Sequence, residues 1–380
     1  MKVMIVVTHL LGTGHLARAM TLARAFEQEG HDTMIVSGGR PAPHLKDAAL
    51  NIAQLPPVQS DGIDFSRLLD AEGQETGPRT LAMRSSLLVG HLSGFAPDAL
   101  ITELFPFGRR ILRDEFLDLL KAAAGLPNRP IVCASIRDIL APPSKPKKAV
   151  FADEVIEEFY HAVLVHSDPS LMPLDLSWPV SDHLSPYLRY TGFVAPPAAA
   201  PQHKKGLGKD EILVSAGGGD VGMHLFHCAV DAARLSSSIR WRLLIGGADA
   251  KEHCTRIMAT APSNLIAEPA RPEFRAMLYR ARASVSFCGY NTALDVLQAQ
   301  CPAVFVPFDA GNEVEQGIRA TALAARPGIA QIATEQMSAA SLLAMVVQVT
   351  NDPPRPSRPF ELDGAAETVS IVENLWGDRT

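Results

Sequence analysis

The sequence lacks three features that would each place it in a broad class of protein. No apolar run reaches the roughly 18 residues that a membrane-spanning helix needs. Basic residues are not in excess, because 35 Lys and Arg stand against 41 Asp and Glu and give a formal net charge of −6. A protein that binds nucleic acid needs cationic side chains that displace counterions. No nucleic-acid partner is therefore expected.

Paired cysteines and closely spaced aspartates are also missing. The 5 cysteines are scattered at positions 133, 228, 254, 288 and 301. An odd number without metal-ligand spacing fits reduced thiols, and the apolar stretch from Met1 is too short for a signal peptide and instead predicts a first strand. We therefore expect a cytoplasmic protein. No Asp-x-Asp pair is present, since Asp61 and Asp64 are too far apart and Asp363 stands alone. We expect chemistry without a metal ion and without a cofactor.

The length of 380 residues, of which 47% are hydrophobic, predicts two soluble domains. Buried strands alternate with helices throughout, which favours an α/β protein with two Rossmann-like, doubly wound parallel sheets that face a cleft. A segment rich in Pro and Ala after Phe193 marks the boundary. We place the first domain at residues 1–192, the linker at 193–210, the second domain at 211–360 and a final helix in 361–380.

The most informative stretch runs from Ser284 to Arg319. It predicts a buried strand over residues 283–287, a turn into a helix over 293–300, a second strand over 302–307, and a second helix that opens at Asn312. Both turns follow the carboxyl ends of parallel strands, where α/β sheets bind ligands. Unpaired N–H groups at a helix start suit phosphate, and acidic or amide side chains suit a ribose or a sugar. A nucleotide-sugar site is therefore predicted here.

The residues assigned to this donor site lie in three groups. The first group follows the strand over residues 283–287, the second lies at the start of the next helix, and the third is a glycine turn that begins the second domain. They are Gly289, Tyr290, Asn291, Thr292 and Asp295; Asn312, Glu315 and Gln316; and Gly217, Gly218 and Gly219. Glycines let the backbone approach a ligand closely, although tight packing of strand and helix would also require them.

A second glycine loop follows the first strand of the chain. Gly12, Thr13 and Gly14 precede His15, but Ala17 stands where a dinucleotide-binding fingerprint needs its third glycine, so an NAD site is disfavoured. His15 at the start of a helix is a candidate general base or phosphate contact, and the positive helix end should keep its ring neutral. A locally hydrogen-bonded helix-start residue remains the alternative.

Two further residues follow the strand over 98–102, at the same edge of the sheet as His15. Glu103 is a candidate to orient His15 or to act as the base itself, and a solvated carboxylate is the alternative. Arg109 and Arg110 precede a predicted helix, where a cation opposes the helix dipole. Such a position is explained if they meet an anionic ligand, although solvated arginines would look the same.

Taken together, these motifs resemble the MurG-like group of GT-B glycosyltransferases, which contains the peptidoglycan lipid-intermediate N-acetylglucosaminyltransferase. The resemblance rests on residues 289–292, Asp295, the apolar strand at 302–307, residues 315–316 with 319–320, and the Gly-x-Gly-His loop. The chain departs in having Asp295 where Glu is usual and a single Gln316 in place of a Gln pair. The resemblance implies transfer of a sugar from a UDP-sugar, resembling UDP-N-acetylglucosamine, with Asp295 on the ribose and Gln316 on the sugar.

The resemblance also implies an acceptor that is lipid-linked or a small molecule, and peripheral contact with the inner face of the membrane. Apolar residues of the predicted helix over 79–95 with Arg84, or Phe105 and Phe107 beside Arg109, would supply the membrane patch, unless they are ordinary core. Two other functions fit the same motifs. One is a nucleotide-sugar hydrolase or 2-epimerase of the same fold, and the other is a non-catalytic nucleotide-binding module.

Overall fold

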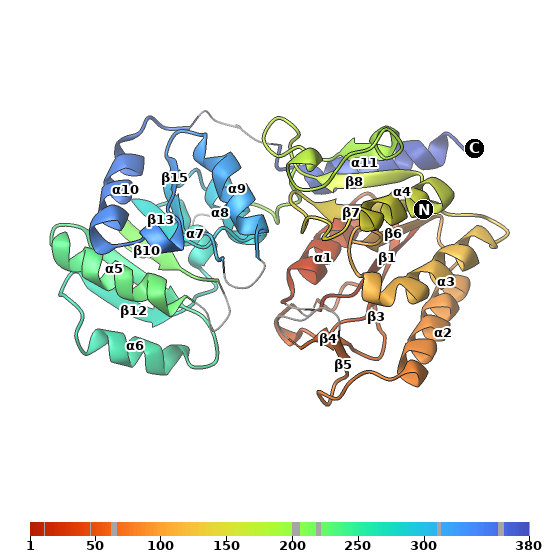
Figure 1. Ribbon diagram of the computed structural model, residues 1–380, viewed down its shortest axis with the longest axis horizontal. Coiled ribbons are helices and arrows are strands. Elements are labelled where there is room, and N and C mark those ends of the chain that lie inside the picture. Colours follow the sequence, from red (N-terminus) through yellow and green to blue (C-terminus); the bar gives the residue numbers. More distant parts are fainter. Residues whose placement is uncertain are drawn as a thin grey trace. The chain divides into compact units, whose positions relative to one another are not determined.

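The computed structural model describes residues 1–10, 12–45, 47–61, 67–199, 206–217, 222–309, 313–355 and 361–379. The chain forms two compact units. The first comprises Met1–Ala195 together with Glu361–Thr380, and the second comprises Pro196–Phe360. Each unit contains its own parallel β-sheet covered by helices, as Figure 1 shows. The α/β class with two doubly wound sheets, predicted from the sequence, is confirmed.

The first unit is built on a seven-stranded sheet with strand order β3-β2-β1-β6-β7-β8-β9. All neighbouring strands in it pair in parallel. The strands are β1 Lys2–Val7, β2 Asp32–Ser37, β3 Ile52–Gln54, β6 Ala99–Glu103, β7 Ile131–Arg137, β8 Ala162–His166 and β9 Leu188–Tyr190. The helices are α1 Gly14–Gln28, α2 Pro78–Phe95, α3 Arg113–Ala124, α4 Lys147–Phe159 and α11 Gly364–Gly377. The strand order reverses at β1: β2 and β3 follow on one side of it, and β6 to β9 follow on the other. The neighbouring strands β1 and β6 therefore form the switch point at which such sheets bind ligands.

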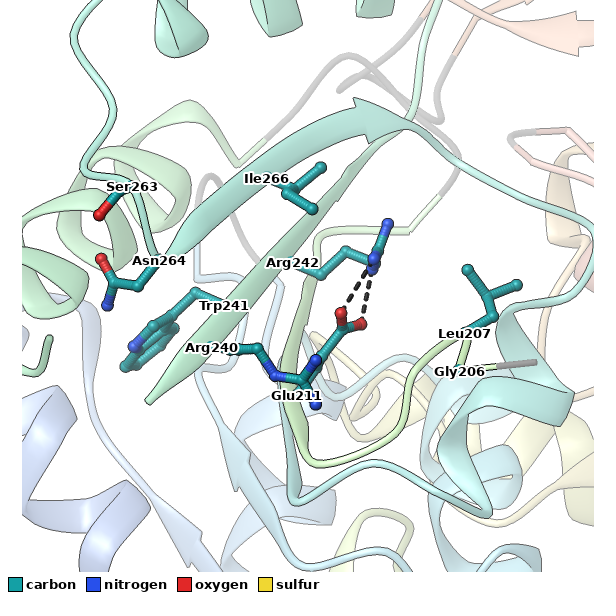
Figure 2. Close-up of a pocket in the computed structure, with 9 residues that line it drawn as sticks. All are labelled: Gly206, Leu207, Glu211, Arg240, Trp241, Arg242, Ser263, Asn264 and Ile266. Carbon is teal, nitrogen blue, oxygen red and sulfur yellow. Dashed lines mark hydrogen bonds and ion pairs between the residues drawn. The ribbon is translucent and has the colours of Figure 1, made fainter. Parts of the chain in front are cut away.

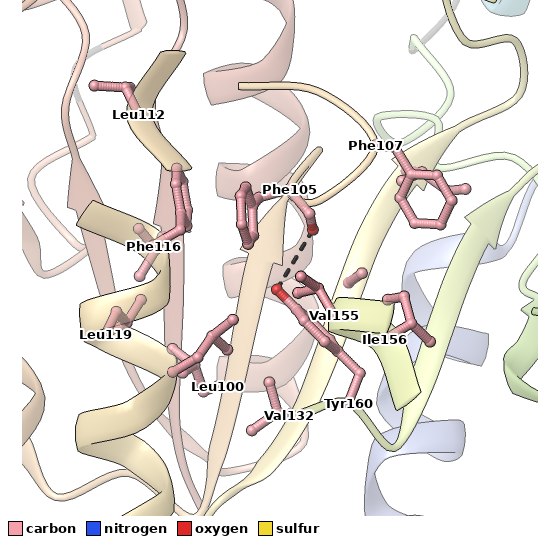
Figure 3. Packing of buried hydrophobic residues seen from close by; sticks show 14 of the residues in the cluster. Leu100, Phe105, Phe107, Leu112, Phe116, Leu119, Val132, Val155, Ile156 and Tyr160 are labelled. Carbon is pink, nitrogen blue, oxygen red and sulfur yellow. Dashed lines mark hydrogen bonds between the residues drawn. The ribbon is translucent and has the colours of Figure 1, made fainter. Parts of the chain in front are cut away.

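Side chains of the central strands alternate between two apolar layers. In β1, Met4 and Val6 point to the layer that α2, α3 and α4 complete, whereas Val3 and Ile5 point to the layer completed by α1 and α11. Figure 3 shows part of the first layer. There the rings of Phe105 and Phe116 are stacked with centroids 4.6 Å apart, a contact that adds about 0.5–1.5 kcal/mol to area burial.

The last helix, α11, packs on the first unit against α1. The backbone N–H of Phe193 donates to the carbonyl of Glu361 at 2.7 Å, and the N–H of Gly364 donates to the carbonyl of Phe193 at 3.1 Å. A Cβ atom at Gly364 would lie 2.4 Å from the carbonyl oxygen of Gly192, so the helix can start here only because this residue is glycine.

The second unit has a six-stranded sheet with order β12-β11-β10-β13-β14-β15. Its strands are β10 Glu211–Ser215, β11 Arg240–Ile245, β12 Leu265–Pro269, β13 Ala283–Ser286, β14 Ala303–Phe305 and β15 Ile329–Gln331. Its helices are α5 Met223–Leu235, α6 Ala250–Met258, α7 Phe274–Leu278, α8 Tyr290–Gln298, α9 Glu315–Ala324 and α10 Ala339–Asn351. The neighbouring strands β10 and β13 lead into the glycine turn and into α8 at the same edge of the sheet.

Several boundaries differ from the sequence-based ones. Helix α8 begins at Tyr290 instead of residue 293, because Gly289 already has the extended conformation of an N-cap. Two short antiparallel strands, β4 Gln59–Ser60 and β5 Leu68–Leu69, form where no strand was predicted from the sequence. Strands only two residues long have no detectable period, so they could not be predicted from the sequence.

Five residues predicted for the membrane patch are buried in the first unit instead. Leu88, Phe95, Phe105 and Phe107 belong to the core of the first unit, and Arg84 is fully buried with its guanidinium paired to Glu115. The apolar face of α2 therefore packs inward, as expected of an amphipathic helix on a sheet.

Candidate active site

The strongest arrangement of titratable groups lies at the carboxyl ends of β1 and β6. His15 is in the first turn of α1, directly after the loop that follows β1, and Glu103 is the last residue of β6. Parallel pairing of β1 with β6 brings these two points together. His15 Nδ1 lies 2.8 Å from Glu103 Oε1, and the His15 side chain is 11% exposed while that of Glu103 is 2% exposed. The structure thus joins the two residues predicted as catalytic.

Glu103 is held by two further donors. The Arg18 guanidinium, one turn along α1, donates to Oε1, and Ser135 Oγ of β7 donates to Oε2 at 2.7 Å. Burial alone would raise the pKa of Glu103, but the Arg18 charge and the hydrogen bonds from His15 and Ser135 hold that pKa well below its usual range. The carboxylate is therefore ionised and can only accept hydrogen bonds.

The ionised carboxylate fixes the proton on the His15 ring. Because Glu103 Oε1 cannot donate, Nδ1 must carry the hydrogen, and the 3.3 Å approach of Arg18 Nη2 to Nδ1 is a contact between two donors. Burial lowers the pKa of His15 to about 3, outweighing the hydrogen bond to Glu103, and Arg109 lowers it further. The neutral ring then has its lone pair on Nε2. The ring is neutral as predicted, but burial rather than the helix dipole is the main cause.

The loops around this pair hold the remaining residues predicted in the first unit. Gly12 has a φ of 66°, which favours glycine, and Thr13 and Gly14 lead into α1. Arg109 also lies in the left-handed region, with φ 58°, and its Nε donates to the carbonyl oxygen of Thr8 at the end of β1. This bond ties the loop after β6 to the loop after β1. Arg109 is half-buried and its charge reaches His15.

In the second unit, the turn from β13 into α8 leaves open space at a helix start. Gly289 is the N-cap of α8, and nothing lies within 4 Å of where its Cβ would be. Asn291 is exposed and Thr292 half-buried in the first turn. Tyr290 is buried, and the Arg319 guanidinium carbon lies 5.9 Å from its ring centroid. Arg319 also donates to the carbonyl of Cys288 at 2.8 Å, so α9 braces this turn from behind.

Asp295 lies away from this helix start, in the second turn of α8. Its Oδ1 accepts from Arg275 Nε of α7 at 2.7 Å. Arg275 also donates to the carbonyl of Pro197 at 2.9 Å, and Gln298 donates to that of Pro196 at 3.0 Å. Burial raises the pKa of Asp295 more than Arg275 lowers it. The carboxylate is thus part of a cluster that holds the start of the segment after the first unit, and its ribose role stays a prediction.

The other residues predicted for the donor site are only partly within the described structure. Gln316 is in the first turn of α9, and its Oε1 accepts from the N–H of Phe308 at 3.2 Å, while Glu315 opens the same helix. Gly217 follows β10 with φ 79° and open space at its Cβ position. Gly218, Gly219 and Asn312 lie outside the described residues. The geometry brings Gly217 and Gly289 to neighbouring strand ends, because β10 pairs with β13.

Three residues near these sites were not singled out in the sequence, and a fourth, Arg319, belonged to the resemblance but was given no role. Arg18, Ser135 and His166 surround Glu103 directly or through one contact, and Arg319 braces the turn at Gly289. Ser135 and His166 each stand at or near the carboxyl end of a predicted strand, next to β6 or one strand further on. That position was a usable signal. Arg18 is one helical turn after His15, a spacing that places both on one face of α1.

A separate pocket of about 390 Å³ lies at the opposite edge of the second sheet, among the first residues of β10, β11 and β12 (Figure 2). Glu211 and Arg242 face each other there in a two-bond ion pair, with N–O distances of 2.6 and 2.9 Å. Arg242 also bonds Glu268 at 2.7 Å. The charges of Glu211 and Arg242 satisfy one another, Arg240 donates to the carbonyl of Lys209, and no residue predicted for the donor site lines the pocket.

Comparison with protein-family models finds no match, and comparison with curated proteins finds none either. Solved structures do match. MurG from Acinetobacter baumannii is 16% identical over 98% of this chain and 100% of its own, with a TM-score of 0.60. CalG4, the calicheamicin glycosyltransferase, is 15% identical over 99% of this chain and 94% of its own, with a TM-score of 0.61. The glycosyltransferase VinC in complex with dTDP is 16% identical over 98% and 95%, with a TM-score of 0.60.

The chain has the GT-B fold. The matches extend over nearly all of each chain, so both parallel-sheet units are part of the likeness. The predicted resemblance to MurG-like proteins is confirmed at the level of fold. At this identity the fold is what the likeness shows, and the activity of a GT-B protein must be argued from its site.

Metal-binding clusters and membrane-spanning helices are both absent from the described residues of this GT-B chain. Among the residues that the structure describes, no cluster of three or more His, Cys, Asp or Glu side chains has the arrangement of a metal site. Within the same residues, no helix is long and apolar enough to span a membrane. Chemistry without a metal stays a prediction.

Proposed function

We propose that this GT-B protein is a glycosyltransferase that moves a sugar from a nucleotide-sugar, UDP-linked, to a hydroxyl of an acceptor, without a metal ion. The observation that supports it best is the His15–Glu103 pair. A neutral imidazole is held in one tautomer by a buried carboxylate, and it stands at the sheet edge where α/β proteins bind substrates. Nucleotide binding alone does not require a neutral base that is held in one tautomer.

In the proposed reaction, His15 is the general base. Its Nε2 accepts the proton of the acceptor hydroxyl while that oxygen forms a bond to the anomeric carbon of the donor. The bond between this carbon and the diphosphate oxygen breaks, and the nucleoside diphosphate leaves with the electron pair. The imidazolium that forms is stabilised by Glu103, which stays ionised throughout. The His15 ring is neutral at neutral pH, so its Nε2 has a lone pair that can accept a proton.

The second unit is the proposed donor site. The diphosphate would bind the N–H groups at the start of α8, where Gly289 leaves open space, and the turn at Gly217 would approach it from the neighbouring strand. Aligned N–H groups and the positive end of a helix stabilise a departing diphosphate, a role that a metal ion fills in other transferases. Gln316 and Glu315 would contact the sugar hydroxyls. VinC is described with bound dTDP, which supports a pyrimidine nucleoside diphosphate here as well.

The test combines binding with turnover. The protein is screened against UDP, dTDP, GDP and ADP by thermal shift, and a ligand at a hundred times its dissociation constant should add about 2.7 kcal/mol to the free energy of unfolding. The preferred nucleotide is then offered as its sugar conjugates, with and without a panel of lipid-linked and small-molecule hydroxyl acceptors. If the protein is a transferase, the nucleoside diphosphate is released only when an acceptor is present.

Release of nucleotide without any acceptor would instead show a hydrolase or a 2-epimerase, and the two differ in whether a free sugar epimer appears. Binding of a nucleotide with no turnover under any condition would leave only a binding module. A shift with ADP alone would contradict the UDP assignment while leaving the transferase reaction open to test with the matching sugar conjugate.

A further inference from the structure

A row of four buried polar groups runs along the carboxyl ends of consecutive strands of the first sheet. Glu103 ends β6, Ser135 lies beside it in β7, His166 ends β8, and Thr191 directly follows β9. Ser135 Oγ lies 2.7 Å from Glu103 Oε2 and 2.9 Å from His166 Nε2. His166 Nδ1 lies 2.8 Å from Thr191 Oγ1. All four residues are at most 2% exposed.

The charge of Glu103 sets the direction of the first two hydrogen bonds in this row. An ionised carboxylate only accepts, so the single hydroxyl hydrogen of Ser135 must point to Glu103 Oε2. Toward His166, Ser135 Oγ can then only accept. His166 Nε2 must therefore carry a hydrogen and donate it to Ser135.

The far end of the row follows from the protonation of His166. Burial lowers the pKa of His166 to about 3, so its ring is neutral at physiological pH, and with a hydrogen on Nε2 its Nδ1 has a lone pair. Thr191 Oγ1 then donates to Nδ1. The same hydroxyl also lies 2.8 Å from the carbonyl of Gly192, so it has an alternative acceptor whenever His166 cannot accept.

Every hydrogen bond in the row thus points toward one carboxylate: Thr191 to His166, His166 to Ser135, and Ser135 to Glu103. On the other side of Glu103, His15 and Arg18 donate to Oε1. Hydrogen bonds aligned head to tail polarise one another, and in a site shielded from water each is stronger than its counterpart in solution. The ring of His15 lies beyond the Glu103 end of the row. No hydrogen bond from another described residue reaches the Nε2 atom of that ring.

We propose that Ser135 and His166 are positioning residues for the proposed base, a hydrogen-bonded relay that holds the Glu103 carboxylate in one orientation and thereby keeps the lone pair of His15 on Nε2. The inference rests on the proposed function for its effect on turnover, but the arrangement of protons is a property of the folded chain alone. Neither residue touches a reacting group. Each acts on the reaction through Glu103.

A purely structural role explains the row less well. Replacing both partners of a buried hydrogen bond by apolar groups of the same shape can be nearly neutral for stability, so stability alone does not require a row of polar groups here. Neighbouring core positions in the same strands, such as Ala134 and Val163, are apolar. Ser167, one residue after His166, provides the comparison: it is equally buried, but its hydroxyl donates to the carbonyl of Met172 and does not contact the row.

The first experiment determines the tautomers by nitrogen-15 NMR of the histidine rings in the full-length protein without ligand. His15 is assigned with His15→Asn and His166 with His166→Gln. The relay requires a hydrogen on Nδ1 of His15 and on Nε2 of His166. A His166 ring with its hydrogen on Nδ1 would overturn the relay, because Ser135 would then have to donate to His166 and could not hold Glu103.

The second experiment compares Ser135→Ala with Ser167→Ala. We expect Ser135→Ala to lower kcat roughly tenfold, the lower range for loss of a hydrogen bond to a charged group, with the KM for the nucleotide-sugar little changed. Its His15 ring should show a mixture of both tautomers. Ser167→Ala should keep the parental tautomer and the parental kcat. Equal loss of kcat in the two variants, or a parental His15 spectrum in Ser135→Ala, would show that Ser135 has a structural role only.

Thr191→Val and Thr191→Ser test the far end with changes of similar size. Valine removes the donor to His166 Nδ1 and should shift the nitrogen-15 resonance of Nδ1 toward that of a lone pair without a hydrogen bond, whereas serine keeps the hydroxyl and should restore the parental resonance. If valine leaves His166 unchanged, the row does not extend to Thr191 and the proposal is contradicted there. The NMR results stand whether or not a nucleotide-sugar is turned over, so failure of the relay and failure of the proposed function are separate outcomes.

Discussion

His15 Nδ1 lies 2.8 Å from Oε1 of Glu103, although 88 residues separate the two in the sequence. The contact exists because β1 and β6 are adjacent parallel strands, so the turn after one meets the last residue of the other. Burial and neighbouring charges set the protonation states of the two side chains. Glu103 is ionised by its partners and His15 is neutral by burial, and together they direct one lone pair of the ring away from the carboxylate.

His15→Asn tests the role of that lone pair. The asparagine amide can donate to Glu103 from nearly the position of Nδ1, but it has no equivalent of Nε2. Loss of a general base typically lowers the rate by 10²–10⁴-fold, and we expect that loss in kcat with nucleotide affinity and melting temperature near the parental values. Steady-state kinetics and calorimetry with UDP measure both. Nearly parental turnover would move the base elsewhere, to Glu103 first, and loss of donor binding alone would make His15 a phosphate contact.

The free energy of unfolding should fall as the pH is lowered from about 6.5, and His166 should account for part of this fall. The folded-state pKa of His166 is about 3, below its ordinary value of 6.5, so between these values the unfolded chain binds a proton that the folded chain does not. The free energy of unfolding then decreases with falling pH, by up to about 1.4 kcal/mol per pH unit for each such histidine. His15, with the same direction of shift, adds to the effect.

His166→Gln should remove one of these protons and flatten the dependence of the free energy of unfolding on pH between 6.5 and 5. This range lies above the ordinary pKa values of Asp and Glu. Glutamine can place an amide N–H near Nε2, and the groups that face this position are Glu103, Arg18, Ser135 and Thr191. His227→Gln, at an exposed position, is the control. Urea unfolding at each pH gives the slopes, and identical slopes in parent and His166→Gln would contradict the assignment.

The sequence predicted the architecture well because burial has a clear pattern in parallel sheets. Strands buried on both faces are short apolar runs, and glycine turns mark their carboxyl ends, so two doubly wound sheets were predictable. The positions of His15 and Glu103 at one sheet edge were predictable for the same reason. Their contact distance, ionisation and tautomer were not, because these depend on Arg18 and Ser135, whose proximity to Glu103 appears only once the strand order is known.

Side-chain direction on helices was the harder problem. Asp295 was predicted to contact a ribose because it follows the turn at Gly289, and the sequence did not indicate that its Oδ1 also accepts from Arg275 of α7. Similarly, leucines of α2 fit a core face and a membrane face equally well in sequence, and only the packing of α2 on α3 and the first sheet identifies them as core. Periodicity predicts that a helix has an apolar face and does not say what covers it.

Membrane binding is expected to be absent on this evidence of packing. Leu88, Phe95, Phe105 and Phe107 of the proposed membrane patch are buried, and the large apolar residues of α2 that remain exposed are Met83 at 49% and Leu87 at 42%, one helical turn apart. Two apolar side chains add little affinity for a bilayer. In flotation with anionic liposomes at low salt, the protein should remain at the bottom of the gradient. A protein that floats, and that stops floating in Met83→Ser with Leu87→Ser, would locate a patch on α2.

Substitutions of Gln316 test whether this residue contacts the sugar or the nucleotide of the donor. Its Oε1 accepts from the N–H of Phe308, which leaves the amide NH₂ as the group proposed to contact donor hydroxyls. Gln316→Glu keeps an acceptor for Phe308 and removes the NH₂ donor, whereas Gln316→Ala removes both. We expect both variants to lose turnover by roughly tenfold, as for one lost hydrogen bond, and to bind free UDP as the parent does. Calorimetry that shows equal losses for UDP and UDP-sugar would assign Gln316 to the nucleotide.

Arg275 and Asp295 provide a test that distinguishes a ribose contact from a structural clamp. The two side chains are 29% and 13% exposed, and Arg275 also holds the carbonyl of Pro197, so the ion pair fastens the segment after the first unit to α7 and α8. Arg275→Ala and Asp295→Ala should each lower the free energy of unfolding by roughly 1–3 kcal/mol, the range for hydrogen bonds to charged groups. In the double variant the losses should fall short of additivity by at least about 0.5 kcal/mol, as for residues in contact. A purely structural clamp requires that UDP affinity, measured by calorimetry, is parental in both single variants. If Asp295→Ala alone weakens UDP by 1.5–3 kcal/mol while Arg275→Ala does not, the carboxylate binds the ribose, and the ion pair is secondary to that role.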